Sequence, residues 1–129
     1  MSGGSPLFIK TFDMLEWLLA HTQKFPKSQR FVMARRMDDA ALGFQDAILR
    51  AAKLPDKRAH LDHADLELDR LKLYNRLAVR LRLHTPAQQE HLARALDELG
   101  RLLGGWKRSL SGGRPRPPGA AVEDASRPA

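Results

Sequence analysis

The feature that most constrains the fold is a repeated spacing. Apolar residues recur every three or four positions over four long stretches, and prolines separate these stretches. Such spacing places the apolar side chains on one face of an α-helix. In the last stretch this face carries Leu92, Leu96, Leu99, Leu103 and Trp106. Aromatic residues make up only 6% of the chain and β-branched residues are scarce, although strands favour both. The sequence therefore predicts an all-α protein.

Local signals place the ends of the four helices. Residues before proline avoid helical geometry, so Phe25-Pro26 and Pro55 end the first and second helices. Thr85-Pro86-Ala87-Gln88 combines an N-cap threonine with a glutamine three residues later, a capping box that begins the fourth helix. The expected helices run from Ser5-Pro6 to the Phe25-Pro26 step, from about 29 to 53, from about 56 to 83, and from 85 onward. Four helices with short links favour an antiparallel up-down-up-down four-helix bundle.

The length and composition predict one domain with an appended tail. The chain has 129 residues and is 43% hydrophobic, which suffices for a single core. After Lys107 the composition shifts to Gly, Pro, Ala and Ser, with a Gly-Gly-Arg-Pro-Arg-Pro-Pro stretch. Such a segment buries too little apolar area to offset the entropy of ordering it. We therefore expect the bundle to cover 1–108 and a disordered tail to cover 109–129.

Several classes of protein are disfavoured by what the sequence lacks. There is no cysteine, which excludes disulfide scaffolds and thiolate metal sites and makes the cytoplasm the expected compartment. No apolar run approaches the roughly 18 residues of a membrane span. Residues 1–6 lack a basic region followed by an apolar one, so we expect no secretory signal. No phosphate-binding loop or nucleophile elbow is present, so we expect neither an enzyme nor a cofactor. His60 and His63 share a helix face and leave a metal site as a third, weaker alternative.

The third expected helix is apolar over roughly twice the arc that packing into one bundle needs. Its apolar residues are Leu61, Leu66, Leu68, Leu71, Leu73, Tyr74, Leu77, Ala78 and Leu81, and the arc is broken by Glu67, Arg70, Asn75 and Arg82. Such a helix is either central in its own fold or buried on its second side against another subunit. Because a four-helix bundle has no central helix, the pattern favours self-association, without fixing the number of subunits.

The charge pattern points towards a polyanionic partner. The formal net charge is +7. Lys72, Arg76 and Arg80 lie four residues apart on one line of the third helix with no acid between them, and like charges at this spacing repel unless an anion neutralises them. Complementarity to the helix dipole is the alternative explanation, because acids dominate the first half of this helix. The candidate residues for binding nucleic acid or a partner are Lys72, Arg76, Arg80, Lys27, Arg30, Lys107 and Arg108.

A second basic row, on the fourth helix, has a simpler explanation. Arg94 and Arg101 follow Glu90 and Asp97 by four residues, the orientation that favours local ion pairs. We therefore interpret this row mainly as a solvated face.

Two motifs carry a resemblance to a known family. The first is Phe25-Pro26-Lys27 followed by Arg30-Phe31, and the second is Glu98-Leu99-Gly100-Arg101-Leu102-Leu103-Gly104-Gly105-Trp106. Together, in this order, they resemble a small four-helix-bundle family with two branches. One branch is the accessory variability determinant (Avd) of diversity-generating retroelements. The other is the protein encoded in intervening sequences of bacterial 23S ribosomal RNA. The resemblance covers roughly residues 8–107.

The resemblance implies a specific function. Avd-like proteins form barrel-shaped homopentamers with a basic surface, and they bind reverse transcriptase and nucleic acid. They support the adenine-directed mutagenic copying of a template RNA into cDNA, while the polymerase carries the catalysis. Basic residues of the third helix are implicated in that family; Lys72 and Arg76 match by position, and Arg80 extends their row. The other branch implies the alternative, a structural or interaction module without a role in reverse transcription.

Overall fold

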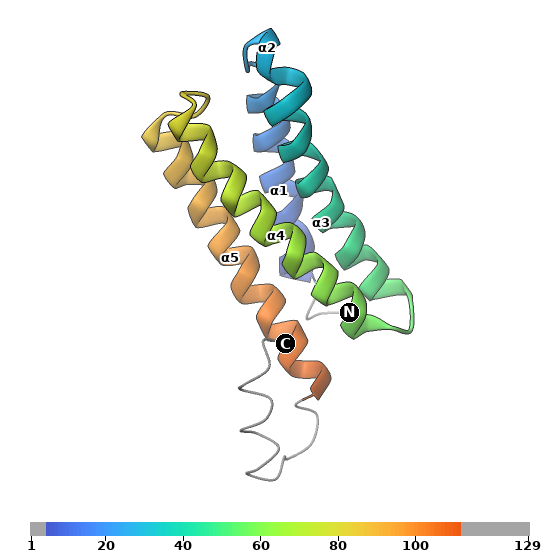
Figure 1. The fold of residues 1–129 in the computed structure, drawn as a ribbon. Helices are drawn as coiled ribbons and strands as arrows, with labels where there is room; N and C mark the ends of the chain where they lie inside the picture. The colour runs from blue at the N-terminus through green and yellow to red at the C-terminus, as the bar shows by residue number, and fades with distance from the viewer. Residues whose placement is uncertain (1–4, 112–129) are drawn as a thin grey trace.

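The computed structural model describes residues 5–111 of the chain (Figure 1). The helices are α1 (Ser5–Thr22), α2 (Lys27–Gln29), η2 (Arg30–Ala34), α3 (Arg35–Lys53), α4 (Lys57–Arg80) and α5 (Pro86–Ser111). Because α2, η2 and α3 follow one another without a gap, they form one long helical segment, and the described residues contain four such segments and no strand. The all-α prediction is confirmed. Within 5–111, no helix is both long enough and apolar enough to cross a membrane.

The four segments enclose one core. Helix α3 packs on α4, α4 on α5, α5 on α1, and α1 on α3. The apolar faces predicted for the first and last helices are confirmed as buried: Leu7, Thr11, Met14, Leu15, Leu18, Leu92, Leu96, Leu99, Leu103 and Trp106. Phe8 of α1 packs against Trp106 with ring centroids 6.5 Å apart, which joins the first helix to the last. Each fully buried leucine contributes about 1.5–3 kcal/mol, so this core is the main source of stability.

Helix α5 begins as predicted and ends later than predicted. The Gln88 N–H donates to Thr85 Oγ1 at 3.1 Å, and the Thr85 N–H donates to Gln88 Oε1 at 2.9 Å, which confirms the capping box. The helix continues to Ser111, three residues beyond the expected end of the bundle at 108. Near this end the Ser109 hydroxyl donates to the Trp106 carbonyl at 2.7 Å. The rest of the predicted tail, 112–129, lies outside the described residues.

The segment η2 is a single π-helical turn. The Arg35 N–H reaches the carbonyl of Arg30, five residues back, where an α-helix would reach four. In an unbroken α-helix Arg30 would lie seven residues before the buried Met37 and therefore on its inward face. The extra residue in the turn rotates Arg30 outward, and Phe31 beside it is 81% exposed. The sequence predicted the helix here but not its wider turn.

Helix α4 carries apolar residues on two sides. Leu61, Leu68 and Leu71 are almost completely buried in the core. On the outer side, the exposed leucines are Leu66 at 56%, Leu73 at 58%, Leu77 at 41% and, just after the helix, Leu81 at 44%. The broad apolar arc is therefore divided between the core and a surface that the single chain leaves uncovered. Burial of that surface against another subunit stays a prediction.

Candidate nucleic-acid interface

The α1–α2 turn and the α4–α5 turn lie at the same end of the bundle (Figure 1). Phe25 of the first turn packs edge-on against His84 of the second, with ring centroids 5.7 Å apart. Trp17 of α1 contacts the same imidazole at 5.8 Å. Because these aromatic contacts join the two turns, the exposed side chains of both turns lie around one end of the bundle, whose surface we describe as a unit.

This surface carries exposed cations from both turns and from the last turns of α4. We call it the basic end, and its members are Lys24, Lys27, Arg30, Arg76, Arg80 and Arg82. Within residues 5–111 none of the six is ion-paired with a carboxylate. No acidic residue occurs between Glu16 and Asp38 in the sequence. Uncompensated cations at one end of a small protein create a positive potential that attracts polyanions.

Four of the seven candidate residues from the sequence lie at the basic end: Lys27, Arg30, Arg76 and Arg80. Arg82, which also lies there, was not among the candidates. It has a φ of 61°, the left-handed conformation that turns the chain after α4. Its place in the short link before the capping box of α5 was the signal that could have identified it.

Lys72 lies earlier in α4, one turn before Arg76 and farther from the basic end, and it is half-buried. Its Nζ is 3.8 Å from Asp97 Oδ1 of α5, so an acid from the neighbouring helix compensates this member of the row. Because Asp97 belongs to a different helix, the residue spacing along α4 does not indicate this pair. Asp97 therefore pairs with Lys72 rather than with Arg101 as expected, whereas the expected pair of Glu90 with Arg94 is present at 3.8 Å.

The structure corrects the expectation for Lys107. Its side chain is buried, and Nζ lies 3.0 Å from Asp62 Oδ1 and 3.0 Å from Asp65 Oδ2 of α4. Burial lowers the pKa of Lys107, but the hydrogen bonds and charges of Asp65 and Asp62 outweigh this effect and leave the pKa raised. Because two carboxylates hold its ammonium inside the protein, Lys107 is not placed to contact phosphate. Arg108 is exposed and belongs to the last turn of α5, and this helix ends opposite the basic end (Figure 1).

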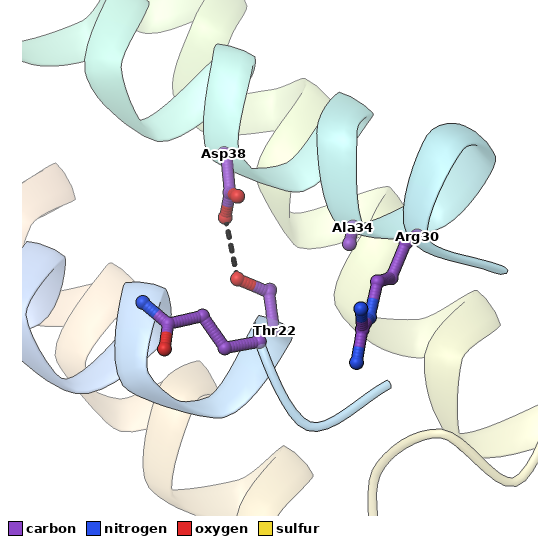
Figure 2. Close-up of a pocket in the computed structure, with 5 residues that line it drawn as sticks. Thr22, Arg30, Ala34 and Asp38 are labelled. Carbon is purple, nitrogen blue, oxygen red and sulfur yellow. Dashed lines mark hydrogen bonds between the residues drawn. The ribbon is translucent and has the colours of Figure 1, made fainter. Parts of the chain in front are cut away.

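A hydrogen bond fixes where the chain leaves α1 towards the basic end. The Thr22 hydroxyl donates to Asp38 Oδ1 of α3 at 2.8 Å (Figure 2). Burial raises the pKa of Asp38, and the hydrogen bond from Thr22 opposes this shift. An open hollow of about 380 Å³ lies beside the pair, lined by Thr22, Gln23, Arg30, Ala34 and Asp38. The bond ties the end of α1 to α3 and so positions the turn that carries the first cations.

The ring that joins the two turns is uncharged at neutral pH. Asn75 donates from Nδ2 to the Gln89 carbonyl at 2.9 Å, so its Oδ1 accepts from His84 Nδ1 at 3.0 Å. This leaves His84 Nε2 buried without a hydrogen-bond partner in the described part of the chain. Burial, together with the nearby His21, lowers the pKa of His84 to about 4. The basic end is thus built around a neutral histidine.

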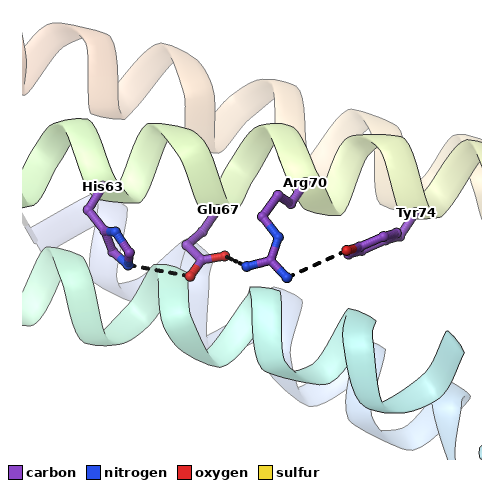
Figure 3. Close-up of polar contacts among 4 residues, drawn as sticks. All are labelled: His63, Glu67, Arg70 and Tyr74. Atoms are coloured by element: carbon purple, nitrogen blue, oxygen red, sulfur yellow. Dashed lines mark hydrogen bonds and ion pairs between the residues drawn. The ribbon is translucent and has the colours of Figure 1, made fainter. Parts of the chain in front are cut away.

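Two of the charged residues that interrupt the apolar arc of α4 serve its packing on α3 (Figure 3). Glu67 is 7% exposed, and its carboxylate lies 2.9 Å from Arg70 Nη1 and 3.4 Å from His63 Nε2. Arg70 also donates to the Tyr74 hydroxyl at 3.5 Å. Gly43 of α3 makes room for the carboxylate, because a Cβ there would lie 2.6 Å from Glu67 Oε2. No group of three or more His, Cys, Asp or Glu suited to a metal ion occurs within 5–111.

The fold and this surface define a small helical bundle with a strongly basic end. Comparison with protein families gives the family: the model described as bAvd-like matches residues 7–110. The chain belongs to this family, the Avd-like proteins of diversity-generating retroelements, which are accessory and non-catalytic. The resemblance carried by the two sequence motifs is confirmed. No curated protein matches the chain. Membership supports an accessory role in such a retroelement.

Proposed function

We propose that this protein binds reverse transcriptase and the template RNA or its cDNA, and so supports adenine-directed mutagenic cDNA synthesis without catalysing it. The observation that carries the proposal is the basic end, six exposed cations without carboxylate partners in residues 5–111 of an Avd-like protein. We also propose that successive helices of the bundle run antiparallel and that the protein acts in the cytoplasm.

The chemistry of the basic end suits a phosphate backbone. Four of its six cations are arginines, whose planar guanidinium groups bind phosphate oxygens through paired hydrogen bonds. Each phosphate that is neutralised releases counterions, so binding weakens as salt rises. Such contacts position a nucleic acid by charge and shape and do not read its sequence.

Assembly would multiply this effect. The exposed leucines of α4 provide a surface for a second copy, and a homopentamer is the assembly that we propose. In a closed ring with cyclic symmetry all subunits point the same way. With the bundles aligned along the symmetry axis, the basic ends would gather on one face of the ring, and several weak phosphate contacts would act on one RNA molecule with higher avidity.

The proposal is tested by titrating a fluorescein-labelled structured RNA at several salt concentrations and following fluorescence anisotropy. We expect Arg76→Glu with Arg80→Glu to weaken binding and to reduce the salt slope by about 1 for each cation removed. The matched control is Arg50→Glu with Arg101→Glu, which changes the net charge equally at two exposed positions of α3 and α5 that have no carboxylate partner within residues 5–111, and leaves the basic end intact. Lys72 is not reversed, because a glutamate there would face Asp97.

Three outcomes would overturn the proposal: no binding by the wild type at low salt, equal loss in both variants, or loss of helicity in the first variant alone. Circular dichroism and light scattering check the last of these.

An intervening-sequence-type interaction module is the second candidate, and the uncovered leucines Leu66, Leu73 and Leu77 favour it. Such a module uses protein contacts and needs no nucleic acid. Co-elution with the reverse transcriptase of a diversity-generating retroelement supports the accessory role. Stable assembly without binding of RNA or of that polymerase favours the module.

A further inference from the structure

Phe31 is an unusual feature of the basic end. At 81% exposed, it is the most exposed large apolar side chain in residues 5–111. It lies in the π turn η2, between the outward Arg30 and the half-exposed Val32. The same turn buries Met33 and Ala34 in the core, so the backbone that displays the ring is anchored. The phenyl group is therefore held out in solvent by a well-packed segment.

The electrostatic setting of Phe31 is cationic. Lys27 precedes it by one helical turn, Arg30 is its neighbour, and both are exposed without carboxylate partners in 5–111. The nearest acids in the sequence are already engaged: Asp38 accepts from Thr22, and Asp39 lies 3.8 Å from Arg35. The ring thus stands among cations that have no internal anion to satisfy them.

We propose that Phe31 is a stacking surface for one unpaired nucleotide of RNA or single-stranded DNA, whose flanking phosphates contact Lys27 and Arg30. This inference rests on the proposed function and adds to it the kind of nucleic acid that is bound. Sites for single strands combine cations that follow the backbone with aromatic rings on which bases stack. A paired base has both faces covered by its neighbours, so the ring would select unpaired segments over duplex.

A second exposed phenylalanine shows which part of this arrangement matters. Phe12 of α1 is 63% exposed, but its neighbours are Asp13 and, one turn on, Glu16. A polyanion would be repelled from that position. Phe12 therefore offers the same ring and similar exposure with the opposite charge around it, which makes Phe12→Ala the matched control.

The experiment uses the full chain and labelled oligonucleotides of about 12 nucleotides, as RNA, as DNA of the same sequence, and as the RNA duplex. We expect Phe31→Ala to weaken binding of the single strands roughly tenfold. Its salt slope should stay at the wild-type value, because no charge is removed. Duplex binding should not change, and Phe12→Ala should behave as the wild type.

Two further variants separate stacking from simple apolar contact. Phe31→Trp should retain affinity for single strands, and its added tryptophan emission should be quenched on binding because the indole stacks on a base. Phe31→Leu should bind as weakly as Phe31→Ala, since it keeps apolar area but has no aromatic face.

Several results would overturn the inference. Unchanged binding of single strands by Phe31→Ala would do so, as would full binding by Phe31→Leu. A lower assembly mass in Phe31→Ala would assign the ring to a contact between subunits. Loss of polymerase capture with unchanged RNA binding would assign it to a protein partner. If the wild type binds RNA and only the arginine reversals weaken it, this inference fails alone; if the wild type binds no RNA, the proposed function fails with it.

Discussion

The two ends of the bundle each bury one titratable side chain, and they treat it in opposite ways. At the basic end the buried group is His84, which burial keeps neutral by lowering its pKa to about 4. At the other end it is Lys107, which stays charged because Asp62 and Asp65 each lie 3.0 Å from its ammonium. One end therefore avoids a buried charge, and the other end buries a charge and pairs it with two half-exposed carboxylates.

This difference indicates how each end uses its surface charge. The carboxylates near Lys107 act inside the molecule, where they join α4 to α5. The cations at the basic end join no helices together, because aromatic contacts around His84 already connect the two turns. The packing of the basic end therefore does not depend on its cations, and they are available to bind an external anion.

The largest expected effect is acid destabilisation through His84. Its folded pKa of about 4 lies below its ordinary 6.5, so the unfolded chain binds the proton more readily and stability falls as the pH drops through this window. Between pH 7 and pH 4 the loss due to this group should be about 3 kcal/mol. His84→Gln keeps a hydrogen-bond donor for Asn75. Between pH 7 and pH 4 its free energy of unfolding, measured with urea, should fall by about 3 kcal/mol less than that of the wild type.

His91→Gln is the control for the acid prediction, because it removes another imidazole that packs on Trp17 and leaves the buried one in place. It should keep the wild-type pH dependence. The same acid sensitivity in His84→Gln would show that the buried ring is not its source and would break the comparison between the ends.

Next in size is the effect of removing the charge at the other end. Lys107→Met keeps most of the side-chain length but leaves Asp62 and Asp65 close together without their cation. We expect a loss of about 2 kcal/mol at neutral pH, measured by urea unfolding. Because the folded pKa is raised, the contribution of Lys107 is present below its ordinary 10.5 and is lost as the pH rises through the folded value. The wild type and Lys107→Met should therefore converge at high pH, and a constant gap would contradict this account.

The smallest effect concerns the α3–α4 packing between the two ends. Alanine favours helices over glycine by about 1 kcal/mol. In Gly43→Ala this gain should disappear, because the new Cβ would lie 2.6 Å from Glu67 Oε2. In a Glu67→Ala background the clash is absent, so the same substitution should stabilise by about 1 kcal/mol. An equal effect in both backgrounds would show that Glu67 does not need the space that Gly43 provides.

The fold could largely be predicted because its signals are local. The capping box of Thr85 and Gln88 and the break at Phe25-Pro26 depend only on neighbouring residues, and the structure has both. The core faces follow from the helical period alone. Membership in the bAvd-like family confirms the resemblance that the two motifs gave.

The candidate site was harder to predict because it depends on which helices meet. Lys107 lies 42 residues from Asp65, and no spacing within one helix shows that they touch. The same holds for Lys72, whose partner Asp97 belongs to another helix. The basic end combines residues of two turns that are far apart in sequence, and the contact of Phe25 with His84 that unites them is tertiary. Helical periodicity gives the faces of a helix but not the identity of its neighbours.

The π turn η2 also has a consequence for how this chain tolerates changes in length. Such a turn is what an α-helix becomes after it accepts one additional residue, so the segment Arg30–Ala34 holds one residue more than a regular helix would. Deleting a single residue there would restore regular winding and turn everything before it by about 100° relative to α3. Phe25 would then leave His84, and the two basic turns would no longer form one surface. The number of residues in the π turn therefore sets how the two basic turns are aligned relative to each other.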